Sequence, residues 1–130
     1  MWRRQKLVGG PLIFFMKKIF FIHFNEAELK EKIAPLKKAG YKVAFHFSTE
    51  KVADFKNNLP DVLVISLDRL PSHGNAYAVW MWEAKKRQHI PIVFCGGKPE
   101  KTGSIKLNFQ KAIFCSNENL VHILDKLNTV

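Results

Sequence analysis

The chain has 130 residues and a net charge of +10, with 47% hydrophobic and 25% charged residues. This length is enough for one hydrophobic core and too short for two, and the composition excludes an intrinsically disordered chain. The sequence has no run of about 18 apolar residues, so no membrane-spanning helix is expected. The only two cysteines, Cys95 and Cys115, lack metal-type spacing, which favours reduced thiols in a cytoplasmic protein.

The positive charge raises the hypothesis of a nucleic-acid partner. Five of the 21 basic residues precede residue 19, which leaves 16 basic residues against 11 acidic ones in the rest of the chain. The body of the protein is therefore only moderately basic, and a nucleic-acid partner is not the first expectation.

Residues 1–16 show no helical or strand periodicity and contain a Gly-Gly-Pro sequence at residues 9–11. We expect a flexible N-terminal extension over residues 1–16, followed by one domain over residues 17–130. Basic residues before a short apolar stretch also occur in signal peptides, but no small-residue cleavage site follows here, so secretion is not expected.

The regular pattern begins with residues 18–24 (KIFFIHF), a continuous apolar run typical of a strand covered on both faces. Asn25 then lies at an N-cap position, with Glu28 three residues later as in a capping box. Apolar residues recur at helical spacing up to Gly40, which predicts a helix that ends there. Pro35 lies inside this helix and is expected to kink it.

Residues 41–47 (YKVAFHF) alternate in polarity and predict a half-covered strand, such as one at a sheet edge. Residues 48–58 (STEKVADFKNN) predict a short helix with few apolar residues to bury. A buried strand is predicted over residues 61–67 (DVLVISL), a helix over residues 74–88 (GNAYAVWMWEAKKRQ) and a strand over residues 90–95 (IPIVFC).

A helix weakened by Gly103 is predicted over residues 100–110, then a strand over residues 112–115 and a last helix capped by Ser116. Five strands that alternate with five helices predict an α/β fold. We expect a flavodoxin-like, doubly wound, five-stranded parallel sheet in the order 2-1-3-4-5, with helices on both faces. Functional groups of such sheets gather where the strands end.

Three segments resemble the receiver domain of bacterial response regulators: AGYKV at residues 39–43, PDVLVISLDRLPSHG at residues 60–74 and IPIVFCGG at residues 90–97. With the order of the elements, the resemblance covers residues 17–127. It implies a phosphorelay switch in which an Asp at the end of the third strand accepts a phosphoryl group. It also implies two acids after the first strand that hold Mg²⁺, a Thr or Ser at the end of the fourth strand and a Lys at the end of the fifth.

Other residue types stand at these positions. Ser66 lies at the acceptor position, His23 and Phe24 at the acidic pair, Gly96 at the hydroxyl position and Ser116 near the lysine position. An acyl phosphate forms when a carboxylate attacks phosphorus while a divalent cation neutralises the developing charge, and Mg²⁺ prefers carboxylate ligands. We therefore expect a degenerate pseudo-receiver without a phosphoacceptor site, with no catalytic residue, metal or cofactor and no enzymatic activity.

Asp68 lies two residues beyond the acceptor position, in a loop one residue longer before Pro71 than is usual in the family. We expect its carboxylate to cap a turn or to pair with Arg69 or a nearby Lys. A transition-metal site formed by His23, His73 and Asp68 is a weaker alternative, since imidazole and carboxylate groups suit Zn²⁺.

Two further patterns carry weaker signals. Cys95 and Cys115 end neighbouring strands and raise the hypothesis of a redox pair, although cysteines at strand ends are usually small buried residues. Gly96 and Gly97 lack the framework of a phosphate-binding loop and follow the fourth strand, where such a loop is not expected.

Trp80 and Trp82 are about 200° apart around a helix, so both cannot face the sheet, and one is expected to lie close to solvent. Trp, Tyr and basic residues together are typical of protein interaction patches, and they could also stack on nucleic-acid bases. The candidate interaction rim or patch consists of Asp68, Arg69, His73, Tyr77, Trp80 and Trp82.

The combined prediction is a non-catalytic, receiver-like signalling or protein-interaction module. The resemblance implies that residues 101–127 bind a protein partner or form a homodimer, with no membrane involved. The alternatives are a nucleic-acid-associated basic protein, or a flavodoxin-like protein that binds a nucleotide or flavin at the edge where the strands end. The absence of a phosphate-binding loop after the first strand argues against a nucleotide or flavin.

Overall fold

The computed structural model describes residues 4–6, 12–14, 18–53, 55 and 59–127. Near the N-terminus, two short strands, β1 (Arg4–Lys6) and β2 (Leu12–Phe14), pair antiparallel. The sequence does not predict this pair, because three-residue strands are too short to show a periodicity. The expected flexibility of residues 1–16 stays a prediction.

The remaining strands form one parallel sheet in the order β4-β3-β5-β6-β7, which confirms the predicted order 2-1-3-4-5. The half-covered strand predicted from its alternating polarity, β4, is an edge strand of this sheet. The bounds of the strands are β3 (Lys18–Ile22), β4 (Lys42–His46), β5 (Val62–Ser66), β6 (Ile92–Cys95) and β7 (Ile113–Cys115).

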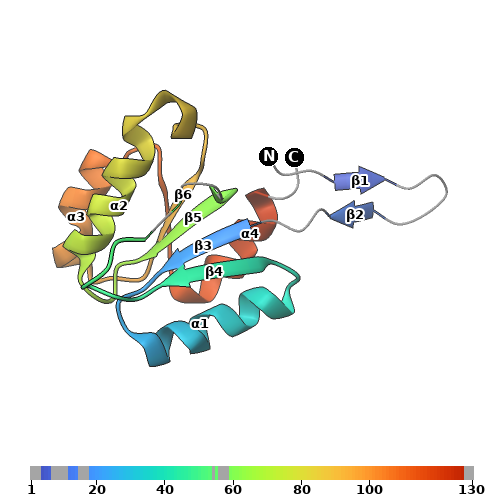
Figure 1. The fold of residues 1–130 in the computed structure, drawn as a ribbon, viewed down its shortest axis with the longest axis horizontal. Coiled ribbons are helices and arrows are strands. Elements are labelled where there is room, and N and C mark those ends of the chain that lie inside the picture. Colours follow the sequence, from blue (N-terminus) through green and yellow to red (C-terminus); the bar gives the residue numbers. More distant parts are fainter. Residues whose placement is uncertain (1–3, 7–11, 15–17, 54, 56–58, 128–130) are drawn as a thin grey trace.

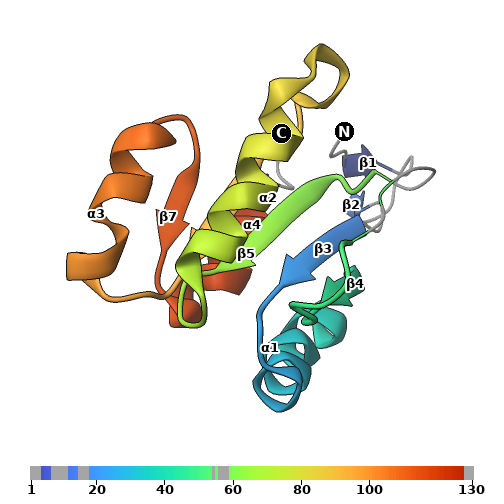
Figure 2. The same cartoon turned by 60° about the vertical axis from the view of Figure 1, so that its left-hand side comes forward.

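Helices cover both faces of the sheet, as Figures 1 and 2 show, with α1 and α4 on one face and α2 and α3 on the other. The helices are α1 (Glu26–Lys38), α2 (Pro71–Glu83), α3 (Pro99–Asn108) and α4 (Leu120–Leu127), with short 3-10 turns at Lys85–Arg87 and Asn117–Asn119. None of the helices within the described residues is long and apolar enough to cross a membrane.

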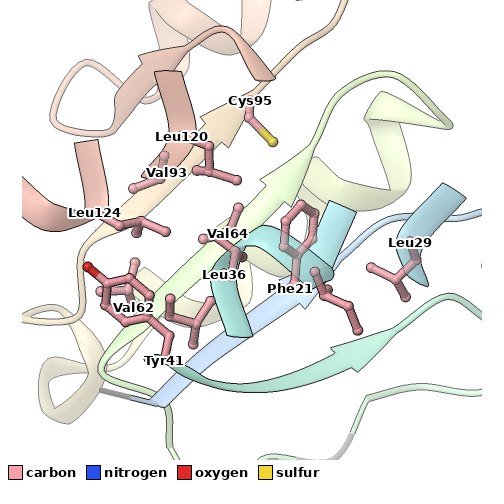
Figure 3. Close-up of a cluster of buried hydrophobic side chains, with 12 residues drawn as sticks. Phe21, Leu29, Leu36, Tyr41, Val62, Val64, Val93, Cys95, Leu120 and Leu124 are labelled. Atoms are coloured by element: carbon pink, nitrogen blue, oxygen red, sulfur yellow. The ribbon is translucent and has the colours of Figure 1, made fainter. Parts of the chain in front are cut away.

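The central strand β5 supplies both hydrophobic layers because successive side chains of a strand point to opposite faces. Val62 and Val64 face α1 and α4, in the cluster that Figure 3 shows, whereas Leu63 and Ile65 face α2 and α3. All five residues of β5 are buried. This two-sided burial explains why the strand reads as a continuous apolar run in the sequence.

The ends of α1 agree with the capping signals in the sequence. The backbone N–H of Glu28 donates to the Asn25 side-chain oxygen over 3.0 Å, as expected for an N-cap. After the helix, Gly40 has a φ of +100°, a conformation that favours glycine. Pro35 lies within the helix and does not end it.

The helix predicted over residues 48–58 is wrong for the part of this segment that the structure describes, which contains bends and no helical turn. The hydroxyl of Ser48 accepts hydrogen bonds from the N–H groups of Glu50 and Lys51, at 3.1 and 3.3 Å. These two bonds form a turn that is not continued as a helix in the described residues. Phe55 is also buried in the α2 and α3 layer, which anchors the segment in an irregular path.

Two helix boundaries also differ from the prediction. Helix α2 begins at Pro71 rather than at residue 74, because proline at the first position of a helix loses no hydrogen bond. The hydroxyl of Ser116 makes no capping hydrogen bond, and the 3-10 turn Asn117–Asn119 separates it from α4.

Candidate functional site

The candidate site lies at the edge where the parallel strands end, between the loops that follow β5 and β6. Asp68 lies in the first loop, and its carboxylate accepts hydrogen bonds from three donors on other elements. The Gly97 N–H donates to Oδ1 over 2.8 Å, the Asn117 side-chain amide donates to Oδ2 over 2.8 Å, and the Lys32 ammonium donates to Oδ2 over 3.3 Å. One carboxylate thereby connects the loops after β5 and β6 with α1 and the turn before α4.

This arrangement confirms that Asp68 pairs with a nearby Lys, which is Lys32, and shows that Arg69 pairs elsewhere. Burial raises the pKa of Asp68, but the hydrogen bonds from Gly97, Asn117 and Lys32 outweigh this effect, so its pKa lies below the ordinary value. The carboxylate is therefore ionised at neutral pH.

The two glycines after β6 make room for this carboxylate. A Cβ atom on Gly96 would lie 2.6 Å from Asp68 Oδ1, and one on Gly97 would lie 2.7 Å from the Cβ of Leu67. Both glycines also have positive φ, +72° and +85°. Glycine is therefore required here by two independent constraints, the backbone conformation and the lack of space.

A second network at the same edge contains His23, Glu28 and Arg69. The His23 Nε2 atom lies 2.8 Å from Glu28 Oε1, and the Arg69 guanidinium donates to both oxygens of the Glu28 carboxylate. These hydrogen bonds, that of Arg69 first, lower the pKa of Glu28 from 4.5 to about 2.

His23 is fully buried, and this burial lowers the pKa of its imidazole despite the nearby carboxylate. A neutral imidazole that donates through Nε2 to Glu28 leaves Nδ1 as an acceptor. This Nδ1 atom has no hydrogen-bond partner among the described residues. His23 therefore positions Glu28, which in turn holds Arg69.

Ser66, at the acceptor position implied by the resemblance, is fully buried at the end of β5. Its hydroxyl accepts a hydrogen bond from the Asp68 N–H over 3.3 Å, so it stabilises the loop that carries Asp68. Burial leaves this hydroxyl no exposed surface from which to react with a phosphodonor.

The residues of the candidate interaction rim lie in separate places in the structure. His73, Tyr77 and Trp80 lie four and three residues apart on α2 and line one cavity together. Trp82 points elsewhere, donating its indole N–H to the Ile90 carbonyl over 2.8 Å. Trp80 and Trp82 are both half-buried, which agrees with the expectation that one of them lies close to solvent.

Trp80 is covered by two neighbours. The Phe55 ring stacks on it with a centroid distance of 5.1 Å, and the Arg87 guanidinium carbon lies 3.8 Å from the Trp80 ring centroid. Whether the rim binds a protein partner stays a prediction.

The metal hypothesis gains no geometric support, whereas Cys95 and Cys115 do lie opposite each other on neighbouring strands. Among the residues that the structure describes, no group of three or more His, Cys, Asp or Glu side chains could hold a metal ion. His73 packs against Phe24 and not against His23 or Asp68. Burial raises the pKa of Cys95 to about 12, which keeps its thiol protonated and unreactive.

Sequence reasoning missed the partners of the two carboxylates and the cavity beside α2. Glu28 was interpreted only as a capping residue, and Lys32 and Asn117 stand in no recognisable motif. The spacing of His73, Tyr77 and Trp80 on one helical face was a signal that could have placed these three side chains together.

Solved structures resemble this fold at low sequence identity. The chemotaxis response regulator CheY4 of Vibrio cholerae superposes with a TM-score of 0.67 and 18% identity, over 86% of this chain and 98% of that chain. The bacteriophytochrome response regulator RtBRR has a TM-score of 0.65 and 14% identity, over 87% and 78% of the two chains. The phosphorylated cyanobacterial phytochrome response regulator RcpA has a TM-score of 0.60 and 16% identity, over 87% and 91%.

No protein-family model and no curated protein matches the sequence. The likeness to the three response regulators shows that this chain has the fold of a response-regulator receiver domain.

Proposed function

We propose that this chain is a receiver-like signalling module that undergoes no aspartyl phosphorylation and acts by binding a protein partner. The observation that carries the proposal is the state of Asp68, the carboxylate nearest to the acceptor position. Both of its oxygens accept hydrogen bonds, from Gly97, Asn117 and Lys32. Asp68 thus serves as a structural connection between loops.

Phosphoryl transfer to a carboxylate needs a free oxygen in line with phosphorus and a divalent cation that neutralises the developing charge. The buried hydroxyl of Ser66 is a poor replacement for such a carboxylate. His23 and Phe24 supply an imidazole already bonded to Glu28 and a phenyl ring, neither of which is a hard oxygen ligand for Mg²⁺. The residues present therefore do not fit a Mg²⁺-dependent phosphoacceptor site.

The partner surface we propose is the face formed by α3, β7 and α4, within residues 101–127. β7 is an edge strand, so one side of its backbone is open to pairing. Leu107 on α3 is 73% exposed and gives this face an apolar side chain for a partner to cover.

Phosphorylation is tested by incubating the protein with acetyl phosphate and Mg²⁺ and recording its intact mass, beside an active receiver protein as a positive control. We expect no gain of a phosphoryl group. A gain that disappears in Asp68→Asn would show that Asp68 is an acceptor, and a gain that disappears in Ser66→Ala would assign it to Ser66. Either result would overturn this part of the proposal.

Partner binding is tested with immobilised protein in which Leu107 is replaced by Glu, with Val52→Glu as the matched control. Val52 is 83% exposed and lies outside residues 101–127. A protein retained by the wild type and by Val52→Glu but lost with Leu107→Glu would support the proposed face. Equal retention by all three proteins would contradict it, and sedimentation of the pure chain would show whether the partner is a second copy.

A further inference from the structure

A cavity lies beside α2, next to the described part of residues 48–58, where the predicted helix does not form. It has a volume of about 640 Å³ and lies between one side of α2 and the irregular segment that follows β4. This volume is in the range of small-molecule sites, which is about 300–1,000 Å³. Figure 2 shows α2 crossing the sheet beside β5.

Four aromatic rings form most of the apolar wall: Phe24, Phe55, Tyr77 and Trp80. Phe55 stacks on Trp80 and meets Tyr77 edge-on at a centroid distance of 6.5 Å, while Phe24 packs against His46 and His73. The wall therefore presents aromatic rings in a preformed arrangement, which is typical of sites that bind flat apolar groups.

Hydrogen bonds hold the polar ends of these rings. The Tyr77 hydroxyl accepts the N–H of Ala53 over 3.0 Å and lies 3.2 Å from His46 Nε2. The Arg87 guanidinium donates to the Trp80 carbonyl over 2.8 Å and lies over the Trp80 ring. The bond from Ala53 connects the irregular segment to α2, and the bond from Arg87 connects the turn after α2 to the helix.

The charged residues among the described lining of the cavity are all basic. Lys51, Lys86 and Arg87 line it, and no described lining residue is acidic. Within the described part of the chain, these three cations make no ion pair. An apolar cavity with three cations and no described acid favours a ligand that is both flat and negatively charged.

We propose that this cavity binds an organic anion with a flat aromatic body, such as an aromatic sulfonate, carboxylate or phosphate. The ring would lie against the wall formed by Phe55, Tyr77 and Trp80, and the acidic group would lie toward Lys51 and Lys86. This site is independent of the proposed function, because it shares no residue with the carboxylate network of Asp68 or with residues 101–127.

The test compares two fluorescent probes with the same kind of aromatic body. 1-Anilinonaphthalene-8-sulfonate is an anion, and N-phenyl-1-naphthylamine is its neutral counterpart. We expect the sulfonate to bind the folded protein about tenfold more tightly at about 20 mM salt, and the difference to shrink at about 200 mM salt, because salt screens exposed charges. Equal binding of the two probes, or no binding of the sulfonate, would overturn the proposal.

Charge variants locate the acidic group of the probe. Replacing both Lys51 and Lys86 with Gln is expected to weaken binding of the sulfonate about fivefold and to leave the neutral probe unchanged. The matched control replaces Lys37 and Lys38 with Gln, two exposed lysines of α1 outside the cavity, and is expected to leave both probes unchanged. Equal effects of the two double substitutions would overturn the assignment to this cavity.

A blocking variant locates the ring of the probe. Ala76 is an exposed α2 residue that lines the cavity, so Ala76→Phe fills space without removing any contact of the wall. We expect both probes to lose at least tenfold in affinity while circular dichroism and the melting temperature show a folded protein. Unchanged binding in folded Ala76→Phe would place the probe elsewhere and overturn the proposal.

Discussion

The carboxylate of Asp68 lies against the backbone of Gly96, so closely that a Cβ atom at Gly96 would stand 2.6 Å from Oδ1. The loop after β5 and the loop after β6 therefore fit each other only because Gly96 and Gly97 have no side chains. The N–H of the next residue, Gly97, donates to the same carboxylate oxygen. A negatively charged group is thereby held at the edge where the central strands end.

Substitution of Gly96 tests this fit. We expect Gly96→Ala to reduce the free energy of unfolding by about 2–3 kcal/mol, from the positive φ and from the contact with Asp68. Urea denaturation measures the change. In the background of Asp68→Ala, the same substitution is expected to cost about 1 kcal/mol less, and equal costs in both backgrounds would show that φ strain acts alone.

The matched control is Gly103→Ala, for which we expect the free energy of unfolding to change in the opposite direction. Gly103 lies in α3, lacks a positive φ, and a Cβ atom there would meet nothing within 4 Å. Because alanine loses less conformational entropy in a helix, we expect a gain of about 0.5–1 kcal/mol in the same urea experiment. A loss of stability would show that α3 needs the glycine for a reason outside these contacts.

Acid should weaken the protein through Glu28. Its pKa is lowered from 4.5 to about 2 in the folded state, so the unfolded state binds a proton more readily. The stabilisation is therefore present above pH 4.5 and is lost as the pH falls toward 2. We expect Glu28→Gln to flatten the decline of the melting temperature over this range.

Glu118→Gln serves as the control for this pH series, because the exposed Glu118 makes no ion pair within the described residues. Its melting profile is expected to follow that of the wild type. Identical profiles for Glu28→Gln and the wild type would contradict the role assigned to the Arg69 and His23 hydrogen bonds.

Leu70 stores backbone strain at the start of α2. It has φ +47° and ψ +62°, the left-handed region, and its side chain is 43% exposed. Replacing it with Gly should relieve the strain and raise the free energy of unfolding by about 0.5–1 kcal/mol. The control is Val79→Gly, an exposed change inside α2, which is expected to lower the free energy of unfolding by about 1 kcal/mol. Thermal denaturation measures both variants. A loss of stability in both would contradict the strain at Leu70.

Tyr41 connects the loop after α1 to α4. Its side chain is buried, and its hydroxyl donates to the Asp125 carboxylate. Burial and this carboxylate raise the pKa of Tyr41. We expect Tyr41→Phe to lower the free energy of unfolding by about 1–2 kcal/mol in urea denaturation. Asp125→Ala should cost less in the Tyr41→Phe background than it does in the wild type. Full additivity of the two changes would contradict the hydrogen bond.

The strands and most of the helices followed from the sequence because their signals are local, and their alternation predicted the doubly wound sheet order. The apolar run of β5 reflects burial on both faces, the alternation in β4 reflects its place at an edge, and the cap at Asn25 needs only residues three positions apart. The missing acidic residues at the positions implied by the receiver resemblance could also be recognised from the sequence alone.

Only the tertiary structure decided which groups meet across long separations in the chain. The three donors to Asp68 lie 29, 36 and 49 residues away, and no periodicity connects them. The segment after β4 has the composition of a short helix, yet the Ser48 turn and the burial of Phe55 give it an irregular path. The cavity beside α2 exists because long-range packing of an aromatic ring outweighed a weak local helical preference.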